Sequence, residues 1–172
     1  MSSSRNLLRI NVGFLLNQPK GTYRDIPLNL PGVRLSPELE TGDLRGFVRI
    51  SRTSEGLLVQ GDFSSSTPAV CVRCLVDFSQ ALHTEFTELY YFPKMVEENT
   101  STGDEPELIL PEDGYIDLSP LLREYLLLEI PIKPLCRADC KGLCLDCGAN
   151  LNQGGCIHTV HTEVGVNQPP GN

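Results

Sequence analysis

The sequence predicts an α+β protein: an antiparallel β-rich domain, barrel- or sandwich-like, with one main helix and a C-terminal cysteine-rich zinc module. Three observations support this class. Apolar and polar residues alternate between residues 44 and 92, a leucine-rich segment that starts with Ser119-Pro120 follows near residues 119–129, and five of the seven cysteines lie between residues 136 and 156. Alternation indicates half-buried strands, and clustered cysteines indicate a metal site.

The expected organisation follows from these features. A chain of 172 residues is long enough for one domain with a small appended module, and its core needs no disulfides. We expect a β-rich domain over residues 1–134, a zinc-binding module over 135–158, and a disordered tail over 159–172, where Pro169-Pro170-Gly171 discourages regular structure.

The first half of the chain predicts strands. Residues 7–16 have the composition of a strand, and residues 23–30 form a second extended piece broken by Pro27. From residue 43 the alternation becomes clear, with arginines on the polar side. The apolar side consists of Leu44, Gly46, Val48 and Ile50. This pattern predicts a half-buried strand, followed by a hairpin turn at 53–56 and a returning strand at 57–63.

A polar connection at 64–68 then leads to Cys71-Val-Arg-Cys74, and the clearest strand begins after Cys74. Its apolar side consists of Val76, Phe78, Leu82, Phe86, Tyr90 and Phe92. This periodicity of two predicts one long, twisted antiparallel strand. His83 lies on the polar side with no ligand pattern beside it in sequence, so we interpret it as a surface residue.

The segment 96–107 is rich in acidic and polar residues and predicts a mobile acidic loop. Residues 115–118 return to extended structure. Ser119-Pro120 predicts a helix start, with a capping hydroxyl and proline at the first helical position, and Pro131 and Pro134 stop the helix. The apolar run 118–132 carries three charged residues and is too short to span a bilayer.

Composition restricts the partners. The 14 basic and 22 acidic residues give a net charge of −8, and seven thiolates with two zinc ions would take it to roughly −11. Such a chain repels phosphate backbones at long range, which favours a basic protein partner. Arg5, Arg9 and Asn11 interrupt any apolar signal segment, so we expect a soluble, cytoplasmic protein with reduced thiols and no membrane association.

Eight side chains are candidate metal ligands. They are Cys71, Cys74, Cys136, Cys140, Cys144, Cys147, Cys156 and His158. Zinc takes four thiolate or imidazole ligands, and two cysteines separated by two residues can bind one ion from a tight turn, called a knuckle here. Gly148 after the second C-x₂-C suits such a turn because glycine accepts a positive φ. We therefore expect one or two zinc ions.

Two pairings of these ligands are open. The preferred one places Cys71, Cys74, Cys136 and Cys140 in one site and Cys144, Cys147, Cys156 and His158 in the other. The alternative joins the two C-x₂-C pairs around one ion, as in a zinc ribbon, and leaves the other four ligands as a poorer site.

The order of these signals resembles that of a known family. Cys71-Val-Arg-Cys74, then Asp113-Gly-Tyr-Ile-Asp-Leu118 before the leucine-rich helix, then Pro131-Ile-Lys-Pro-Leu-Cys-Arg-Ala-Asp-Cys-Lys-Gly-Leu-Cys-Leu-Asp-Cys-Gly-Ala-Asn-Leu-Asn152 resembles the YceD family, the large ribosomal RNA subunit accumulation proteins. The resemblance covers roughly residues 45–158. It implies a role in accumulation or processing of large-subunit ribosomal RNA, with a ribosomal RNA precursor or a basic ribosomal protein as partner.

Three functional classes follow. The favoured one is a noncatalytic ribosome-assembly factor with structural zinc, which contributes folding free energy directly. The second is a metal-dependent RNA-processing enzyme, which would need an open coordination position and a nearby general base. The third is a thiol redox protein, but a thioredoxin-like C-x-x-C opens a helix after a strand, whereas Cys71 is expected between two strands. The sequence therefore nominates no catalytic residue.

Overall fold

The computed structural model describes residues 7–95 and 108–158, and the chain divides into two compact units. The first unit draws on residues 1–68 and 80–131, and the second on residues 69–79 and 132–172. The expected acidic loop at 96–107 and the expected tail after residue 158 lie outside the described residues. The second unit thus combines two stretches of chain that are far apart in sequence.

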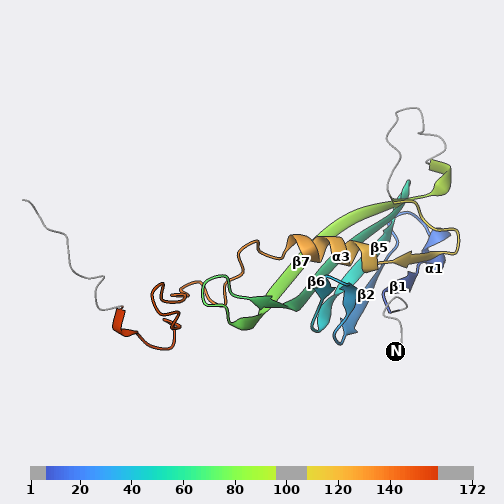
Figure 1. The fold of residues 1–172 in the computed structure, drawn as a ribbon. Helices are drawn as coiled ribbons and strands as arrows, with labels where there is room; N and C mark the ends of the chain where they lie inside the picture. The colour runs from blue at the N-terminus through green and yellow to red at the C-terminus, as the bar shows by residue number, and fades with distance from the viewer. Residues whose placement is uncertain (1–6, 96–107, 159–172) are drawn as a thin grey trace, which may run out of the picture. The chain divides into compact units, whose positions relative to one another are not determined.

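A four-stranded antiparallel sheet forms the body of the first unit (Figure 1). Its strands are β2 (Tyr23–Leu30), β5 (Leu44–Arg52), β6 (Gly56–Val70) and β7 (Asp77–Tyr91), in the order β2-β5-β6-β7. The sheet is open, with β2 and β7 at its edges. The sequence suggested a barrel- or sandwich-like domain. The described strands of this sheet do not close into a barrel, and the α+β class and the antiparallel pairing are confirmed.

The alternation in β5 and β7 is confirmed. Leu44, Val48 and Ile50 are buried on one side of β5, while Arg45 and Arg49 are exposed on the other. The hairpin from β5 to β6 is fixed by Thr53, whose hydroxyl oxygen accepts the backbone N–H of Gly56 at 3.0 Å. Gly56 must lack a side chain, because a Cβ there would lie 1.9 Å from the carbonyl oxygen of Tyr90.

Three expectations about strand boundaries were wrong. β2 is not broken at Pro27, which pairs with Phe47 of β5, because an edge strand tolerates a missing N–H. β6 continues through the expected polar connection at 64–68 to Val70. The expected strand at 7–16 shortens to β1 (Arg9–Asn11) and is followed by the four-residue helix α1 (Gly13–Leu16).

Two short antiparallel ribbons accompany the sheet. β1 pairs with β8 (Tyr115–Asp117), so that Ile10 lies opposite Ile116. β3 (Arg34–Ser36) pairs with β4 (Leu39–Glu40). The extended structure expected before the helix is thereby confirmed.

The main helix, α3, runs over Ser119–Leu128, close to its expected range. The capping expectation was wrong in its detail. Ser119 lies inside the helix, and the carboxylate of Asp117 accepts its backbone N–H at 2.9 Å. Pro120 occupies the first turn, where a missing N–H costs nothing.

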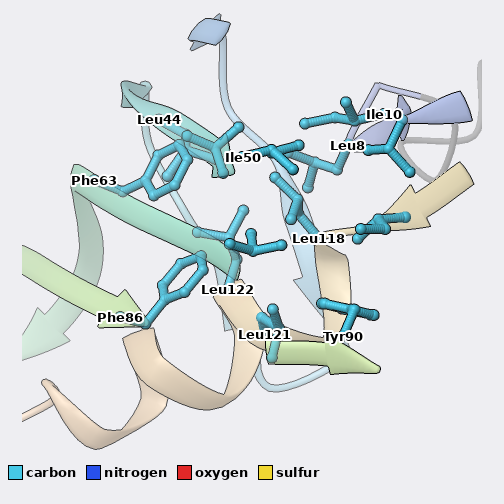
Figure 2. Close-up of a cluster of buried hydrophobic side chains, with 14 of the residues drawn as sticks. Leu8, Ile10, Leu44, Ile50, Phe63, Phe86, Tyr90, Leu118, Leu121 and Leu122 are labelled. Atoms are coloured by element: carbon cyan, nitrogen blue, oxygen red, sulfur yellow. The ribbon is translucent and has the colours of Figure 1, made fainter. Parts of the chain in front are cut away.

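α3 packs on the sheet through its apolar side (Figure 2). Leu121, Leu122 and Leu126 are buried in the same cluster as Ile50, Phe63 and Phe86 of the sheet and Leu8, Ile10 and Leu118 of the β1–β8 region. The Phe86 ring stacks between Phe63 at 6.1 Å and Tyr125 at 5.1 Å, measured between ring centroids. Along the described stretches of chain, no helix has the length and apolar character needed to cross a membrane.

Candidate metal centre

The second unit is built around the turn between β6 and β7. Cys71 to Cys74 form a knuckle in which the backbone N–H of Leu75 donates to the carbonyl oxygen of Cys71 at 2.9 Å and the N–H of Cys71 donates to Val76 at 3.0 Å. This turn also bonds to the distant segment. The N–H of Val72 donates to Pro134 at 3.0 Å.

Four cysteines meet at this knuckle. The group consists of Cys71, Cys74, Cys136 and Cys140. Three of these side chains are buried, and their sulfurs lie within 4.8 Å of one another. The Sγ atoms of Cys71 and Cys140 are 3.7 Å apart, and those of Cys74 and Cys136 are 3.6 Å apart.

These separations fit a tetrahedral thiolate site. Zinc–sulfur bonds of about 2.3 Å place the sulfurs of a tetrahedron about 3.8 Å apart, which the two measured distances nearly match. A disulfide would require a separation of about 2.05 Å, and none of the seven cysteines, all of which lie in the described ranges, forms a disulfide. The first group can therefore hold a metal ion with little rearrangement.

The second C-x₂-C repeats the same backbone turn. The N–H of Gly148 donates to Cys144 at 2.9 Å, and the N–H of Cys144 donates to Ala149 at 2.8 Å. These bonds occupy the same relative positions as those of the first knuckle. The chain thus contains two knuckles of one design, and each presents two sulfurs to one side.

The second group draws all four of its ligands from one short stretch of chain, residues 144–158. It consists of Cys144, Cys147, Cys156 and His158, whose ligand atoms also lie within 4.8 Å of one another. The Sγ of Cys156 is 3.9 Å from Nδ1 of His158. Cys144 is buried, whereas Cys147 is exposed. The structure thus brings the eight predicted ligands together in the two groups of the preferred pairing, and the two C-x₂-C pairs do not share one group.

In each group, hydrogen bonds lower the pKa of one thiol and so favour the thiolate form that binds metal. Although burial disfavours its thiolate, backbone N–H groups led by that of Cys136 lower the pKa of Cys71 to about 6. The backbone N–H groups of Cys147 and Asp146 lower the pKa of Cys144 to about 7.

Neighbouring thiols resist ionisation. The pKa of Cys136 is raised to about 12, mainly because its thiol is buried and next because it lies beside the thiol of Cys74. Four thiolates at these distances repel one another, and a divalent cation offsets that repulsion because its charge stabilises every coordinating thiolate. The donor set is soft and nearly all sulfur, which favours zinc over magnesium or calcium.

Asn152 supports the first group, and sequence reasoning assigned it no role. Its side-chain N–H donates to the sulfur of Cys140 at 3.4 Å, and its carbonyl oxygen accepts the backbone N–H of Lys141 and a guanidinium N–H of Arg137, each at 2.8 Å. The only sequence signal for this role was the position of Asn152, three residues after Ala149, whose carbonyl oxygen accepts the bond that closes the second knuckle. Such bonds to a ligand's sulfur hold it in position.

The two knuckles differ in the residue that follows the second cysteine. Gly148 has φ 71° and Leu75 has φ 57°, both in the left-handed region. That conformation costs a residue with a side chain about 1–2 kcal/mol. Leu75 is 64% exposed, so little burial compensates this cost.

We therefore expect opposite effects from exchanging these residue types. Gly148→Ala should lower the stability of its knuckle by about 1 kcal/mol, and Leu75→Gly should raise that of the first knuckle by up to about 1 kcal/mol. The added Cβ at residue 148 meets no atom within 4 Å, so its effect is conformational. Amide hydrogen exchange at Cys144 and Cys71 measures each knuckle, and effects of the same sign would contradict the expectation.

Fold and donor groups together define a class: a small α+β protein whose second unit carries two cysteine-rich groups able to hold metal ions. The family model described as large ribosomal RNA subunit accumulation protein YceD matches residues 59–169, so the chain belongs to the YceD family. The match includes all eight candidate ligands.

Several relatives support this membership. An uncharacterized protein of Mycobacterium bovis is 36% identical over 104 residues, which are 60% of this chain and 49% of the relative. A chloroplastic large ribosomal RNA subunit accumulation protein YCED homolog 1 of Arabidopsis thaliana is 50% identical over 46 residues, which are 27% of this chain and 14% of the relative. The chain spans about half the length of the mycobacterial relatives it matches. No solved structure gives a significant match.

Proposed function

We propose that this chain is a noncatalytic factor that supports accumulation of large-subunit ribosomal RNA during ribosome assembly, and that two zinc ions hold its second unit together. The tetrahedral spacing of the first sulfur group carries the zinc part of the proposal. Family membership carries the ribosomal part. The proposed compartment is the cytoplasm, where thiols remain reduced and available to metal.

The coordination pattern supports a structural role for the ions. Each group supplies four protein ligands, which is the full set for a tetrahedral structural site, whereas a catalytic zinc keeps a position for water or substrate. A metal-dependent RNA-processing enzyme is the second candidate. A redox role has less support, because Cys71 and Cys74 lie in a turn between two strands and face other thiols across the group.

The proposed partner is a ribosomal RNA precursor or a basic ribosomal protein. The net charge of −8 favours the protein, because like charges keep this chain and a phosphate backbone apart at long range. Binding to a basic ribosomal protein would bring the chain to large-subunit precursors without requiring a basic surface of its own.

Cells that lack the chain should accumulate less large-subunit ribosomal RNA relative to small-subunit RNA, and the intact chain should restore the ratio. In gradients, part of the chain should sediment with large-subunit precursors. A variant with both Cys74→Ser and Cys147→Ser should fail in both assays, because its second unit would lack metal. An unchanged RNA ratio together with purely free protein would contradict the proposal. Metal-dependent cleavage of precursor RNA by the pure chain would instead support the second candidate, an RNA-processing enzyme.

A further inference from the structure

A third cluster of metal-ligand side chains lies in the first unit, on the solvent-facing side of the sheet. It consists of Asp62 on β6 and His83 and Glu85 on β7. β6 and β7 are neighbours in the sheet, and residues two apart on a strand point to the same face. The three side chains therefore converge from adjacent strands, away from the buried core.

The distances within this cluster suit a small cation. One ligand atom from each residue lies within 4.8 Å of the others. The ring of His83 is 3.9 Å from Asp62 through Nδ1 and 3.5 Å from Glu85 through Nε2. Ligands bound at about 2.1 Å in a tetrahedron lie about 3.4 Å apart, so small rotamer changes of exposed side chains would complete the arrangement.

Ser64 adds the support that metal-bound histidines usually have. Its Oγ lies 3.2 Å from Nδ1 of His83. When one ring nitrogen binds a metal, the other commonly keeps a hydrogen bond that fixes the ring orientation. Ser64 and Asp62 lie beside Nδ1 and Glu85 lies beside Nε2. An ion bound through Nε2 would leave Nδ1 its contact with Ser64, and the Asp62 side chain would turn toward the ion.

The charges of the cluster are unbalanced without a cation. Within the described ranges, neither Asp62 nor Glu85 forms an ion pair with lysine or arginine, and the ion-pair contact of each carboxylate is with His83. Arg49, which lines the same depression as Asp62 and Glu85, is bound through two hydrogen bonds to Asp25 at 2.6 and 2.8 Å. A divalent ion would neutralise both carboxylates.

Asp62 and Glu85 also border a depression of about 280 Å³ on this face. Phe47, Arg49, Gln60 and Thr87 line it as well. An ion held by three protein ligands keeps further positions for water or an incoming anion, and the depression gives such a group access. This differs from the cysteine groups, where four protein ligands surround the position.

We propose that Asp62, His83 and Glu85 form a site for a divalent transition-metal ion, distinct from the two cysteine groups in donor type and in the unit that carries it. Imidazole and carboxylate oxygens suit manganese and zinc, whereas thiolates bind manganese poorly. The site leaves coordination positions open beside the depression. It stands independently of the ribosomal role and of the metal content of the cysteine groups.

Manganese tests this site selectively. Mn²⁺ added to the full-length, ¹⁵N-labelled chain should first broaden the amide signals around Asp62, His83 and Glu85, because paramagnetic broadening is confined to the neighbourhood of the ion. Glu85→Gln should weaken Mn²⁺ binding about tenfold or more. Glu55→Gln removes the same charge from an exposed glutamate in the β5–β6 turn and should leave the affinity nearly unchanged.

His83→Gln provides a second variant, since the exposed side chain can change without disturbing the core. It should also lose the local broadening while the signals of distant residues keep their positions, which shows that the fold is intact. Equal Mn²⁺ affinity in Glu85→Gln and Glu55→Gln would overturn the proposal. So would the absence of broadening at millimolar Mn²⁺, or broadening that begins among residues 97–107.

Discussion

Substitution of Cys74 by serine should lower the zinc content of the purified chain from two ions to one. Cys74 is buried and its sulfur lies 3.6 Å from that of Cys136, so the variant removes one of the four thiolates that would hold the ion in the first group. Elemental analysis after dialysis measures the content. Cys147→Ser should likewise remove one ion, from the second group. Asp146→Asn, an exposed change between Cys144 and Cys147, should keep both.

The double variant Cys74→Ser/Cys147→Ser separates the two pairings. If the two groups bind separate ions, each substitution removes one ion and the double variant should lose both cysteine-bound ions. In a zinc ribbon built from both C-x₂-C pairs, both substitutions would affect the same ion, and the double variant would lose no more than either single variant. That second result would refute the pairing proposed here.

Loss of the first ion should also loosen the second unit selectively. Structural zinc contributes about 10–16 kcal/mol of binding free energy in small zinc peptides, far more than the few apolar side chains around Cys71 provide. Amide exchange at Val72 and Leu143, which bond to Pro134 and Arg73, should become fast in Cys74→Ser. Exchange at Val48 and Val59 in the first unit should stay slow.

The second large effect concerns the core of the first unit. Phe63→Ala should lower its free energy of unfolding by about 3–5 kcal/mol, because a fully buried ring is replaced by a cavity on β6 beside the ring of Phe86. Denaturant unfolding followed through tyrosine fluorescence measures the loss. Zinc content should remain unchanged, because all eight candidate ligands lie in the second unit.

Phe47→Ala is the matched control. Phe47 lies on the neighbouring strand β5 but is 41% exposed on the opposite face, so its loss should cost under about 1 kcal/mol. Similar losses for Phe47→Ala and Phe63→Ala would contradict the assignment of the two faces of the sheet.

Sequence periodicity predicted the parts of the fold that depend on one buried face. β5 and β7 each bury alternate residues, and α3 carries proline in its first turn and buries leucines, so local pattern and tertiary packing agree. The errors arose where pairing overrode composition. Pro27 lies in a continuous strand because β5 pairs with its whole length. The polar residues 64–68 remain in β6, where the carbonyl oxygen of Ser66 accepts the backbone N–H of Gly42 and the Thr67 hydroxyl donates to the carbonyl oxygen of Glu40.

The ligands of the two metal groups could be predicted from the sequence where they lie close together along the chain. Two C-x₂-C pairs and the cluster after residue 135 identify the donors, but spacing alone left the pairing open, since the fold decides that Cys71 meets Cys140. His83 illustrates the limit. His83 is on the surface, as predicted. Its neighbour Asp62 lies on another strand, 21 positions away in sequence. A local sequence pattern does not identify a residue that is close only across a sheet.

The two cysteine groups also differ in how the chain encloses them. Cys71 and Cys140 are 69 positions apart, whereas Cys156 and His158 are two apart and Cys147 is exposed. An ion in the first group therefore closes a large ring of polypeptide, and its departure requires buried segments to separate. An ion in the second group can leave through local fraying. The two metals should consequently exchange with solution at different rates, with the C-terminal one turning over faster.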